Sequence, residues 1–360
     1  MTRTKPFAAL IVALLALPAC KNEATPAVAA PAVTTVTVMT LNAQNLFDNI
    51  DDPGKDDKAY LPFAAKQGDD HIAACAAIPV ESWRNECLHL DWSDLAIDVK
   101  LTALGATIRQ VNDGQGADII ALQEVENLAI LERLRTEKLA GLGYRPAILI
   151  EGSDARGIDV ALLSKFPLRG GAILHPLELP DFVEQARDTR GVLQATFELP
   201  DQSLLTAFAV HFPAPYQPTA MRIAAYRHLA SLLAALPEDH HAVAAGDFNT
   251  TSKEDRETGL LDAWARPHWT LAHDLGCEPC KGTYFYGRDN TWSYLDMILF
   301  APARGAKTTA QIRGDSVAIA NAYPAQNSES GTPRRFDPES GNGVSDHWPM
   351  IASIEVAIKQ

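Results

Sequence analysis

The sequence predicts an α+β protein in which two mixed β-sheets pack face to face, with helices on their outer faces. Short β-rich runs recur from residue 34 to the end of the 360-residue chain. Some neighbouring runs are joined by short turns and others by helices, which argues against a doubly wound parallel sheet. No linker divides the chain into halves, so a single domain is expected at residues 34–358.

The N-terminus has the features of an export signal. Two basic residues precede an apolar stretch at 7–17, which is shorter than the ~20 residues that a bilayer-spanning helix needs. The stretch leads into Leu-Pro-Ala-Cys, ending at Cys20, and resembles a bacterial lipobox, in which the cysteine is cleaved free and lipidated. We therefore expect residues 1–20 to be a lipoprotein signal peptide, residues 21–33 an Ala/Pro-rich tether, and the protein to be anchored at the cell envelope, in the outer membrane. Plain secretion and an uncleaved anchor are the alternatives.

The composition is acidic, with 45 Asp and Glu residues against 31 Lys and Arg and a net charge of −14. This balance argues against broad, non-specific attraction to polyanions. It does not exclude a phosphate-containing substrate, because a bound divalent cation inverts the local field. A charged fraction of 21% and a hydrophobic fraction of 47% exclude a disordered chain.

Four further cysteines fit an oxidising compartment. They are Cys75, Cys87, Cys277 and Cys280. Of the three possible pairings, we predict Cys75–Cys87 and Cys277–Cys280, because each pair closes a short polar segment rich in turn-forming residues. A four-cysteine zinc site is the alternative. A redox Cys-x-x-Cys is less favoured, because the second pair does not open an apolar helix.

The first elements follow from local patterns of polar and apolar residues. Alternation predicts a strand at 34–41. The segment 48–93 is polar and interrupted by Pro and Gly, which indicates a long insertion. Apolar residues at helical spacing then predict a helix at 97–111, with Gly114 beyond its end.

Strands dominate the rest of the chain. They are predicted at 118–122, 144–150, 158–164, 192–199, 204–212, 242–245, 294–300 and 350–356. Helical patterns cover 128–139 and 219–236. The stretch 321–343, rich in Ser, Gly, Pro and Asn, indicates a mobile loop.

Polar side chains lie at the ends of these strands, where core packing does not explain them. They are Asn42, Glu124, Asp159, His211, Asp247 with Asn249, Asp296, and Asp346 with His347. Singly, an Asn or Asp after a strand is most often a turn residue. Asp296 is different, because it interrupts an apolar run and a buried carboxylate is costly unless it is paired or bound to metal. So many polar strand ends predict a shared functional site.

The order and separation of these residues resemble the endonuclease/exonuclease/phosphatase superfamily, which includes deoxyribonucleases, abasic-site endonucleases, sphingomyelinases and inositol-polyphosphate 5-phosphatases. The resemblance covers residues 35–357. It rests on Asn42, Gln-Glu at 123–124, Gly-Asp-Phe-Asn at 246–249, Tyr-Leu-Asp at 294–296 and Ser-Asp-His at 345–347. It implies a four-layer α/β/β/α sandwich with the site at one rim, and hydrolysis of phosphoesters that depends on a divalent metal.

The resemblance also implies a metal site and a base. Glu124 matches the metal-binding carboxylate, and Asn42 and Asp346 lie near the same ion. Asp247 matches the residue that orients or deprotonates the attacking water, and Asn249 matches its hydrogen-bonding helper. Oxygen ligands of this kind suit Mg²⁺, with Mn²⁺ as a substitute.

Two histidines and an arginine complete the implied site. His347 matches the histidine that contacts the phosphate, steered by Asp296. His211 matches a second histidine of the deoxyribonuclease and sphingomyelinase branches, a general acid for the leaving oxygen. Arg190, just before a strand, is a candidate substrate contact, and Asp159 occupies a matching strand position without an assigned role.

Gln44 is a departure from the family pattern, because many bacterial relatives have an acidic residue there. With one carboxylate fewer, the site is expected to bind its cation with modest affinity. A Gln44→Glu variant is then expected to bind the metal more tightly.

The expected function is that of an envelope-anchored, Mg²⁺-dependent phosphodiesterase that acts on DNA or RNA as a monomer. Hydrolysis of a phospholipid or sphingomyelin headgroup, or of a small phosphate ester, ranks second, because the insertion at 48–93 is polar with scattered aromatic residues. A non-catalytic binding module with the same fold is a third hypothesis. Such a module should have lost at least one of Glu124, His211, Asp247 and His347, and all four are present.

Overall fold

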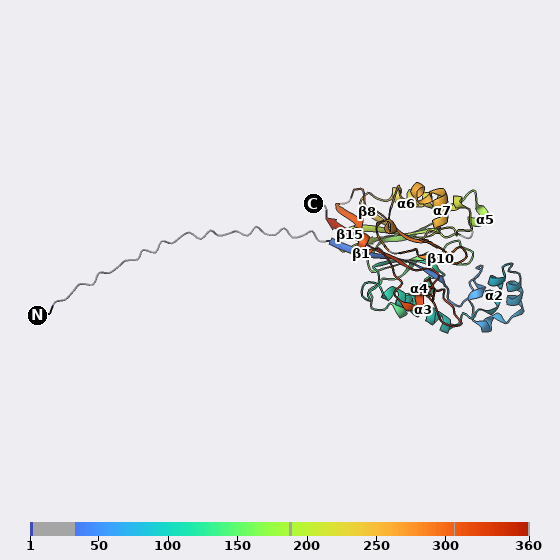
Figure 1. The fold of residues 1–360 in the computed structure, drawn as a ribbon. Coiled ribbons are helices and arrows are strands. Elements are labelled where there is room, and N and C mark those ends of the chain that lie inside the picture. Colours follow the sequence, from blue (N-terminus) through green and yellow to red (C-terminus); the bar gives the residue numbers. More distant parts are fainter. Residues whose placement is uncertain (3–32, 187–188, 279, 306, 359–360) are drawn as a thin grey trace. The chain divides into compact units, whose positions relative to one another are not determined.

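A computed structural model describes the chain over residues 1–2, 33–186, 189–278, 280–305 and 307–358. All described helices and strands belong to one compact unit, residues 32–360, drawn in colour in Figure 1. Among these helices, none has the length and apolar character needed to cross a membrane. Cys20 and the rest of the predicted signal peptide lie outside the described residues.

The strands begin and end close to the predicted positions in most cases. They are β1 (Val33–Leu46), β2 (Ile119–Val125), β3 (Ile148–Leu149), β4 (Asp159–Ser164), β5 (Leu168–His175), β6 (Val192–Glu198), β7 (Leu204–His211), β8 (His240–Asp247), β9 (Thr270–Leu271), β10 (Tyr284–Tyr286), β11 (Thr291–Ser293), β12 (Asp296–Ala301), β13 (Thr308–Ile312), β14 (Ala318–Ile319) and β15 (Met350–Ile358).

The helices are more numerous than the periodicity predicts. They are α1 (Asp69–Ala76), α2 (Glu81–His89), α3 (Asp94–Arg109), α4 (Leu128–Arg133), α5 (Val183–Ala186), α6 (Thr219–Ala235), α7 (Ser252–Thr258), α8 (Leu260–Trp264) and α9 (Ala272–Leu275). Single helical turns are η1 (Lys58–Tyr60), η2 (Phe63–Lys66), η3 (Leu134–Lys138), η4 (Gly314–Ser316) and η5 (Pro324–Gln326).

Two large mixed sheets form the centre of the fold. The first runs in the order β13-β15-β1-β2-β4-β3, with β14 paired to β15, and the second in the order β5-β6-β7-β8-β12-β9. The pairs β1–β2 and β7–β8 are parallel, and β10 with β11 forms a separate hairpin. Figure 1 shows the sheets between α3 and α4 on one side and α6 and α7 on the other. The predicted fold class, two mixed sheets flanked by helices, is confirmed.

Apolar side chains on both faces of the central strands create this layering, because successive residues of a strand point to opposite faces. In β1, Val38 faces the other sheet and Leu41 packs under α3 and α4. In β7, Ala207 faces the first sheet and Phe208 packs against α6. The central strands of each sheet are therefore buried on both faces.

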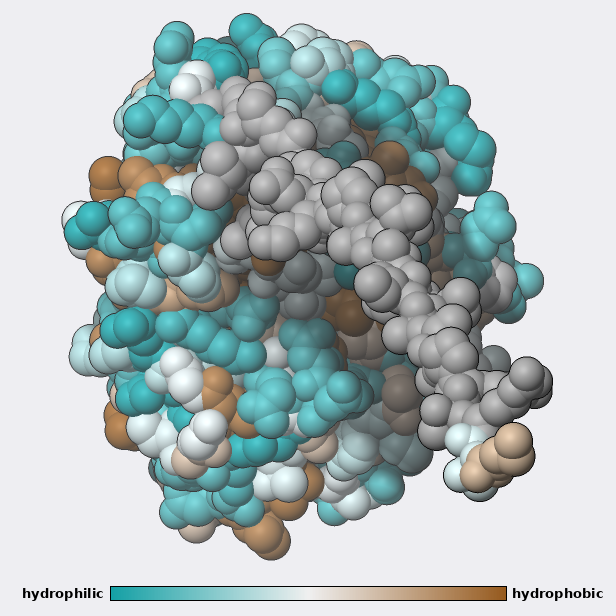
Figure 2. Space-filling view, turned by 90° about the vertical axis from the view of Figure 1, so that its left-hand side faces the viewer, coloured by the Kyte–Doolittle hydropathy of each residue, from teal (hydrophilic) through white to brown (hydrophobic). Residues whose placement is uncertain are grey.

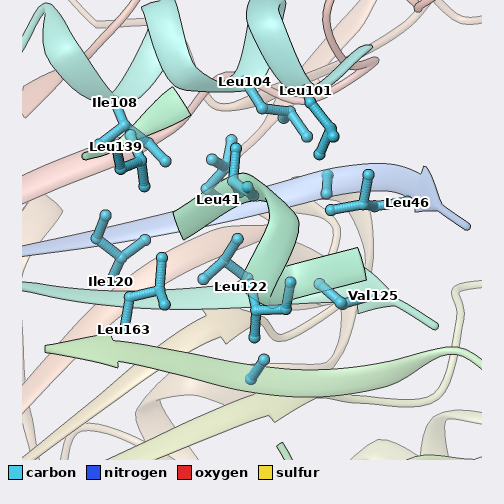
Figure 3. Close-up of a cluster of buried hydrophobic side chains, with 14 of the residues drawn as sticks. Leu41, Leu46, Leu101, Leu104, Ile108, Ile120, Leu122, Val125, Leu139 and Leu163 are labelled. Carbon is cyan, nitrogen blue, oxygen red and sulfur yellow. The ribbon is translucent and has the colours of Figure 1, made fainter. Parts of the chain in front are cut away.

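The outer layer over the first sheet is anchored by α3. Ser93 caps this helix by accepting a hydrogen bond from the Ala96 amide at 3.4 Å. Its buried residues Leu101, Leu104 and Ile108 lie over β1 and β2 in Figure 3. The helix predicted at 97–111 is confirmed, with a start slightly earlier in the sequence.

One face of the molecule is mainly polar. The face shown in Figure 2 exposes mostly hydrophilic residues, with hydrophobic residues scattered among them.

The insertion at 48–93 folds into α1 and α2, which periodicity did not predict. A disulfide between Cys75 and Cys87 joins the two helices, and these cysteines are their only buried residues. Helices of eight and nine residues with one buried position each carry no amphipathic pattern. The two ends of the insertion meet, because the Asn49 side chain donates a hydrogen bond to Asp94 Oδ1 at 3.1 Å.

The second predicted disulfide, Cys277–Cys280, is also present. With all four sulfur atoms paired in this way, the alternative of a four-cysteine zinc site is wrong.

Three other predictions are corrected. The strand predicted at 144–150 is reduced to β3, because Tyr144 turns into the core and donates its hydroxyl to the Ala117 carbonyl at 2.6 Å. The helix predicted at 128–139 divides into α4 and η3. The loop predicted to be mobile at 321–343 is packed, with Phe336 buried in the core beneath α3.

Candidate active site

Strand register in the second sheet places three of the predicted residues side by side. His211 ends β7, Asp247 ends β8, and the parallel pairing sets them opposite each other. Asp296 begins β12 and lies opposite Asp247 in the antiparallel pairing. All three side chains are buried, and His211 Nε2 is 3.6 Å from Asp247 Oδ2.

Strand irregularities in the first sheet direct Glu124 into the same region. The pairing of β2 with β4 shifts between Gln123 and Val125, and Glu124 takes a positive φ of 60°. Such a bulge redirects a side chain at the end of a strand. Glu124 Oε2 accepts a hydrogen bond from the Asn45 amide at 2.9 Å, which fixes the carboxylate.

Asn42 connects the two sheets. Its Nδ2 donates to Asp247 Oδ2 at 3.2 Å and lies 3.4 Å from Glu124 Oε1. Its Oδ1 accepts from the Gln44 amide at 2.9 Å. In this arrangement the side-chain amide of Asn42 joins two carboxylates, whereas the resemblance implies that its oxygen faces a metal ion.

The segment before β15 brings His347 to the site. Ser345 Oγ donates to the Asn42 carbonyl at 2.8 Å and accepts from the His347 amide at 3.1 Å. His347 Nδ1 donates to Asp296 Oδ2 at 2.7 Å, as the resemblance implies. The Tyr284 ring packs against the imidazole, with ring centroids 4.9 Å apart.

The two histidines are held in different protonation states. Burial alone would lower the pKa of His347, but the charge and hydrogen bond of Asp296 outweigh it and raise the pKa to about 10. Burial lowers the pKa of His211 well below its usual value, and the charges of Arg190 and Arg156 act in the same direction. At neutral pH, His347 is therefore a cation and His211 is neutral.

Asp247 has the properties of a base. Burial raises its pKa to about 7, with the charge of His347 opposing the shift and Asp296 adding to it. Its Oδ1 accepts from the Asn249 amide at 2.8 Å. The Asn249 side chain donates to the Phe212 carbonyl at 2.9 Å, so Asn249 supports Asp247 through its backbone.

The residues present fit a divalent cation. The carboxylate oxygens of Asp247 and Asp296 lie within 4.8 Å of each other, and His347 stands beside them as a cation that is not itself a ligand. Within the described part of the chain, Asp296 Oδ1 is buried and has no hydrogen-bond partner. A buried carboxylate oxygen left in this state is costly, and cation coordination removes that cost. Glu124, beside Asn42, adds another oxygen donor.

Asp346, the third predicted metal ligand, forms an ion pair with Arg335. Its Oδ2 lies 3.2 Å from Arg335 Nη1, at the surface. The charge of Asp346 nevertheless contributes to the raised pKa of His347. Asp346 therefore lies close enough to the buried cluster for its charge to stabilise the protonated form of His347.

Arg190 is held beside His211 by a buried ion pair. Its Nε lies 3.1 Å from Asp154 Oδ2, and both side chains are almost fully buried. Asp159 accepts a hydrogen bond from the Gly152 amide at 2.9 Å, and burial raises its pKa to about 7. Asp159 thus stabilises a loop near the site.

Gln44 does not face the carboxylates. Its Oε1 accepts from the Phe336 amide at 2.8 Å, and its Nε2 donates to the Phe336 carbonyl at 3.3 Å. The side chain therefore fastens the 321–343 segment to β1. Because Gln44 contacts the Phe336 backbone, we expect a glutamate at this position to leave metal binding unchanged.

A cavity of about 270 Å³ lies next to the site and includes residues that the sequence analysis missed. Its lining includes Asn45, Tyr60, Glu86 and Arg335, and Asn45 also contacts Glu124. Tyr60 and Glu86 belong to the insertion, so the insertion forms one wall. No local sequence pattern predicts that these residues line a cavity, because they come together only in the folded chain.

Comparisons with known proteins identify the family of this chain. The model of the Endonuclease/Exonuclease/phosphatase family matches residues 95–347. A comparison with curated proteins finds no match.

Several solved structures have a similar fold. One is an endonuclease/exonuclease/phosphatase from Beutenbergia cavernae, with a TM-score of 0.53 and 16% identity over 90% of this chain and 72% of that one. Another is D. rerio TDP2 complexed with a single-strand DNA product, with a TM-score of 0.53 and 15% identity over 89% and 99%. A mannosyl-6-phosphatase from Bacteroides thetaiotaomicron has a TM-score of 0.52 and 17% identity over 89% and 99%.

Asp247→Ala and His347→Ala should each leave a folded protein and lower phosphoesterase activity at least ~10²-fold, because each removes a positioned acid–base or charged group. Turnover and circular dichroism of the purified variants measure this. The exposed residues Asp262 and His268 provide matched alanine controls, which should keep full activity. Unchanged turnover in either site variant would remove that residue from the mechanism.

Gln44→Glu should leave the metal dependence of activity unchanged and destabilise the protein by about 1–3 kcal/mol, because a carboxylate cannot donate to the Phe336 carbonyl. Denaturant unfolding and a metal titration of the activity measure the two effects. Gln67→Glu is the matched control, since Gln67 is exposed and also donates to a backbone carbonyl. A shift of the metal curve to lower concentration would place Gln44 beside the ion after all.

Proposed function

The chain belongs to the endonuclease/exonuclease/phosphatase family, whose members are metal-dependent phosphoesterases, and we propose that it hydrolyses phosphodiester bonds with Mg²⁺ at this site. The proposal rests on Asp247. This buried, hydrogen-bonded carboxylate lies between the cationic His347 and the neutral His211. A water-activating base, a charge for the phosphate and a partner for the leaving oxygen are thus all within one cluster.

Each residue contributes a separate part of the reaction. A base with a pKa near 7 is matched to proton abstraction at neutral pH, which suits Asp247 to orienting or deprotonating the attacking water. The imidazolium of His347, oriented by Asp296, offers a positive charge to the phosphoryl oxygens. A divalent cation held by Glu124 and neighbouring oxygens supplies Lewis-acid stabilisation when it is bound.

His211 is assigned to the leaving oxygen, although its pKa in the free protein is low. The arginines that depress this pKa, Arg190 and Arg156, also attract phosphate. A bound phosphodiester brings negative charge, which favours the protonated imidazole. The substrate itself therefore promotes the protonation that a general acid requires.

A nucleic acid is the substrate that the surroundings favour. Arginine guanidinium groups border the acidic cluster at Arg156, Arg190 and Arg335, and such groups bind phosphates through paired hydrogen bonds. The adjoining cavity offers Tyr60 and Arg335, and aromatic and guanidinium planes can stack on nucleobases. The similar TDP2 structure holds a single-strand DNA product.

A lipid headgroup is the second candidate, supported by one observation on the insertion. Phe63, Ile72 and Trp83 are exposed there, with 59% of the Trp83 surface open to solvent. Exposed aromatic and aliphatic side chains near a site suit contact with a lipid surface. The cavity with Tyr60 and Arg335, which suits stacking on nucleobases, favours the nucleic acid.

The proposed location is the outside of the cell envelope, through a lipid on Cys20. The two disulfides support an oxidising compartment. A lipid anchor together with the stretch at 21–33 would hold the enzyme close to a membrane while the site faces external substrate.

The proposed activity is tested with purified protein in Mg²⁺ or EDTA, offered plasmid DNA, RNA, sphingomyelin and a chromogenic phosphodiester. Nucleic acid should be cleaved fastest, Mn²⁺ should replace Mg²⁺, and Zn²⁺ should support little activity because it prefers nitrogen and sulfur ligands. The Asp247→Ala variant controls for contaminating nucleases. Full activity in EDTA would overturn the mechanism, and cleavage of sphingomyelin alone would assign the second candidate.

Cys20→Ser should abolish lipidation and move the protein from the membrane fraction to the soluble fraction. Fractionation of cells labelled with a clickable fatty acid measures both effects. Mutating Cys280 instead should leave the lipid label in place. Lipid-labelled, membrane-bound Cys20→Ser protein would refute the proposed anchor.

A further inference from the structure

A second cluster of carboxylates lies where the insertion leaves β1 and meets the end of β2. Asp52 and Asp57 come from the insertion, and Glu126 follows the last residue of β2. The ligand atoms of these three residues lie within 4.8 Å of one another. They form a group separate from Asp247, Asp296 and His347.

The surrounding loop is built around this group. Glu126 Oε2 accepts from the Asp48 amide at 2.7 Å and from Asn127 Nδ2 at 3.2 Å. Asp57 Oδ2 accepts from the Asp52 amide at 2.8 Å. These bonds hold the carboxylates toward a common point.

One oxygen of the cluster has no partner. Asp57 is only 1% exposed, and among the described residues its Oδ1 has no hydrogen bond. Glu126 is 3% exposed, and within the same described residues no lysine or arginine side chain pairs with Asp52, Asp57 or Glu126. Two buried carboxylates beside a half-buried one, without a neutralising charge, are costly unless they are protonated or coordinate a metal.

We propose that Asp52, Asp57 and Glu126 form a structural calcium site that fastens the insertion to the end of β2. Oxygen atoms that share one Ca²⁺ at about 2.3–2.6 Å lie within about 5 Å of one another, as these do. Ca²⁺ accepts irregular sets of carboxylate and carbonyl oxygens, whereas Mg²⁺ demands near-ideal octahedral geometry at shorter distances.

The proposed calcium site lies close to residues of both the candidate active site and the cavity. Glu126 is two residues from Glu124, and the loop that carries Asp52 and Asp57 leads directly to Tyr60, which lines the cavity. The Tyr60 amide also donates to the Asp57 carbonyl at 2.7 Å. A cation here would fix both the cavity wall and the strand end that carries Glu124.

Calcium binding to the purified, chelator-stripped protein tests the proposal without any activity assay. Isothermal titration with CaCl₂ should show a site with a dissociation constant of about 10⁻⁴–10⁻³ M or tighter, and the melting temperature should rise with Ca²⁺. Asp57→Asn and Asp52→Asn should weaken Ca²⁺ binding at least about tenfold. Asp52 is only half-buried, so Asp52→Asn is expected to fold. If Asp57→Asn does not fold, Asp52→Asn alone tests whether this cluster binds calcium.

Two controls separate this site from the catalytic cluster and from general acidity. Glu124→Gln should retain calcium binding, and Asp70→Asn, an exposed change in the same insertion, should behave as the parent. Loss of calcium binding in Glu124→Gln alone would overturn the proposal and place the ion among the catalytic residues. Equal affinity in the parent, Asp52→Asn and Asp57→Asn, or no calcium-dependent heat and melting shift, would also overturn it, and equal affinity for Mg²⁺ would overturn the choice of ion.

Discussion

Burial of carboxylates at the ends of adjacent strands is the constraint on which the candidate site depends. Asp247 and Asp296 lie opposite each other in neighbouring strands, almost wholly removed from water, so each needs a compensating partner. His347 supplies a positive charge to Asp296, and the Asn42 amide and the Asn249 backbone donate to Asp247. These partners come from both sheets and from the segment before β15, so the acidic pair requires the whole sandwich to be assembled.

The same constraint explains why the two histidines differ. Both imidazoles are buried, and burial disfavours charge in each. His347 has the hydrogen-bonded carboxylate of Asp296 at 2.7 Å and remains protonated, whereas His211 faces two arginines and is neutral. The two histidines thus differ because of the charges around them and not because of their residue type. His347 is suited to holding phosphate, and His211 is suited to exchanging a proton with the leaving oxygen.

The core strands and the residues at their ends could be predicted because both depend on short-range patterns. Apolar runs in β2 and β7 reveal strands buried on both faces, and Glu124 and His211 stand out as polar endings. Other features depend on distant partners: Gln44 is separated by 292 residues from Phe336, which it binds. The helices of the insertion depend on a disulfide and bury one cysteine each, and Tyr144 left its predicted strand for a hydrogen bond to the core. None of these contacts produces a periodic pattern of polar and apolar residues that could be recognised in the sequence.

The meeting of Asn49 and Asp94 has an evolutionary implication. Because the insertion leaves and rejoins the sandwich at neighbouring points, its length and composition can change without altering the register of any central strand. Residues that line the cavity wall, such as Tyr60 and Glu86, lie inside this exchangeable segment, whereas Asp247 and His211 lie on strands that cannot shift. Selection can therefore alter which molecules reach the acidic centre, by insertion, deletion or recombination, while the reactive groups are inherited unchanged.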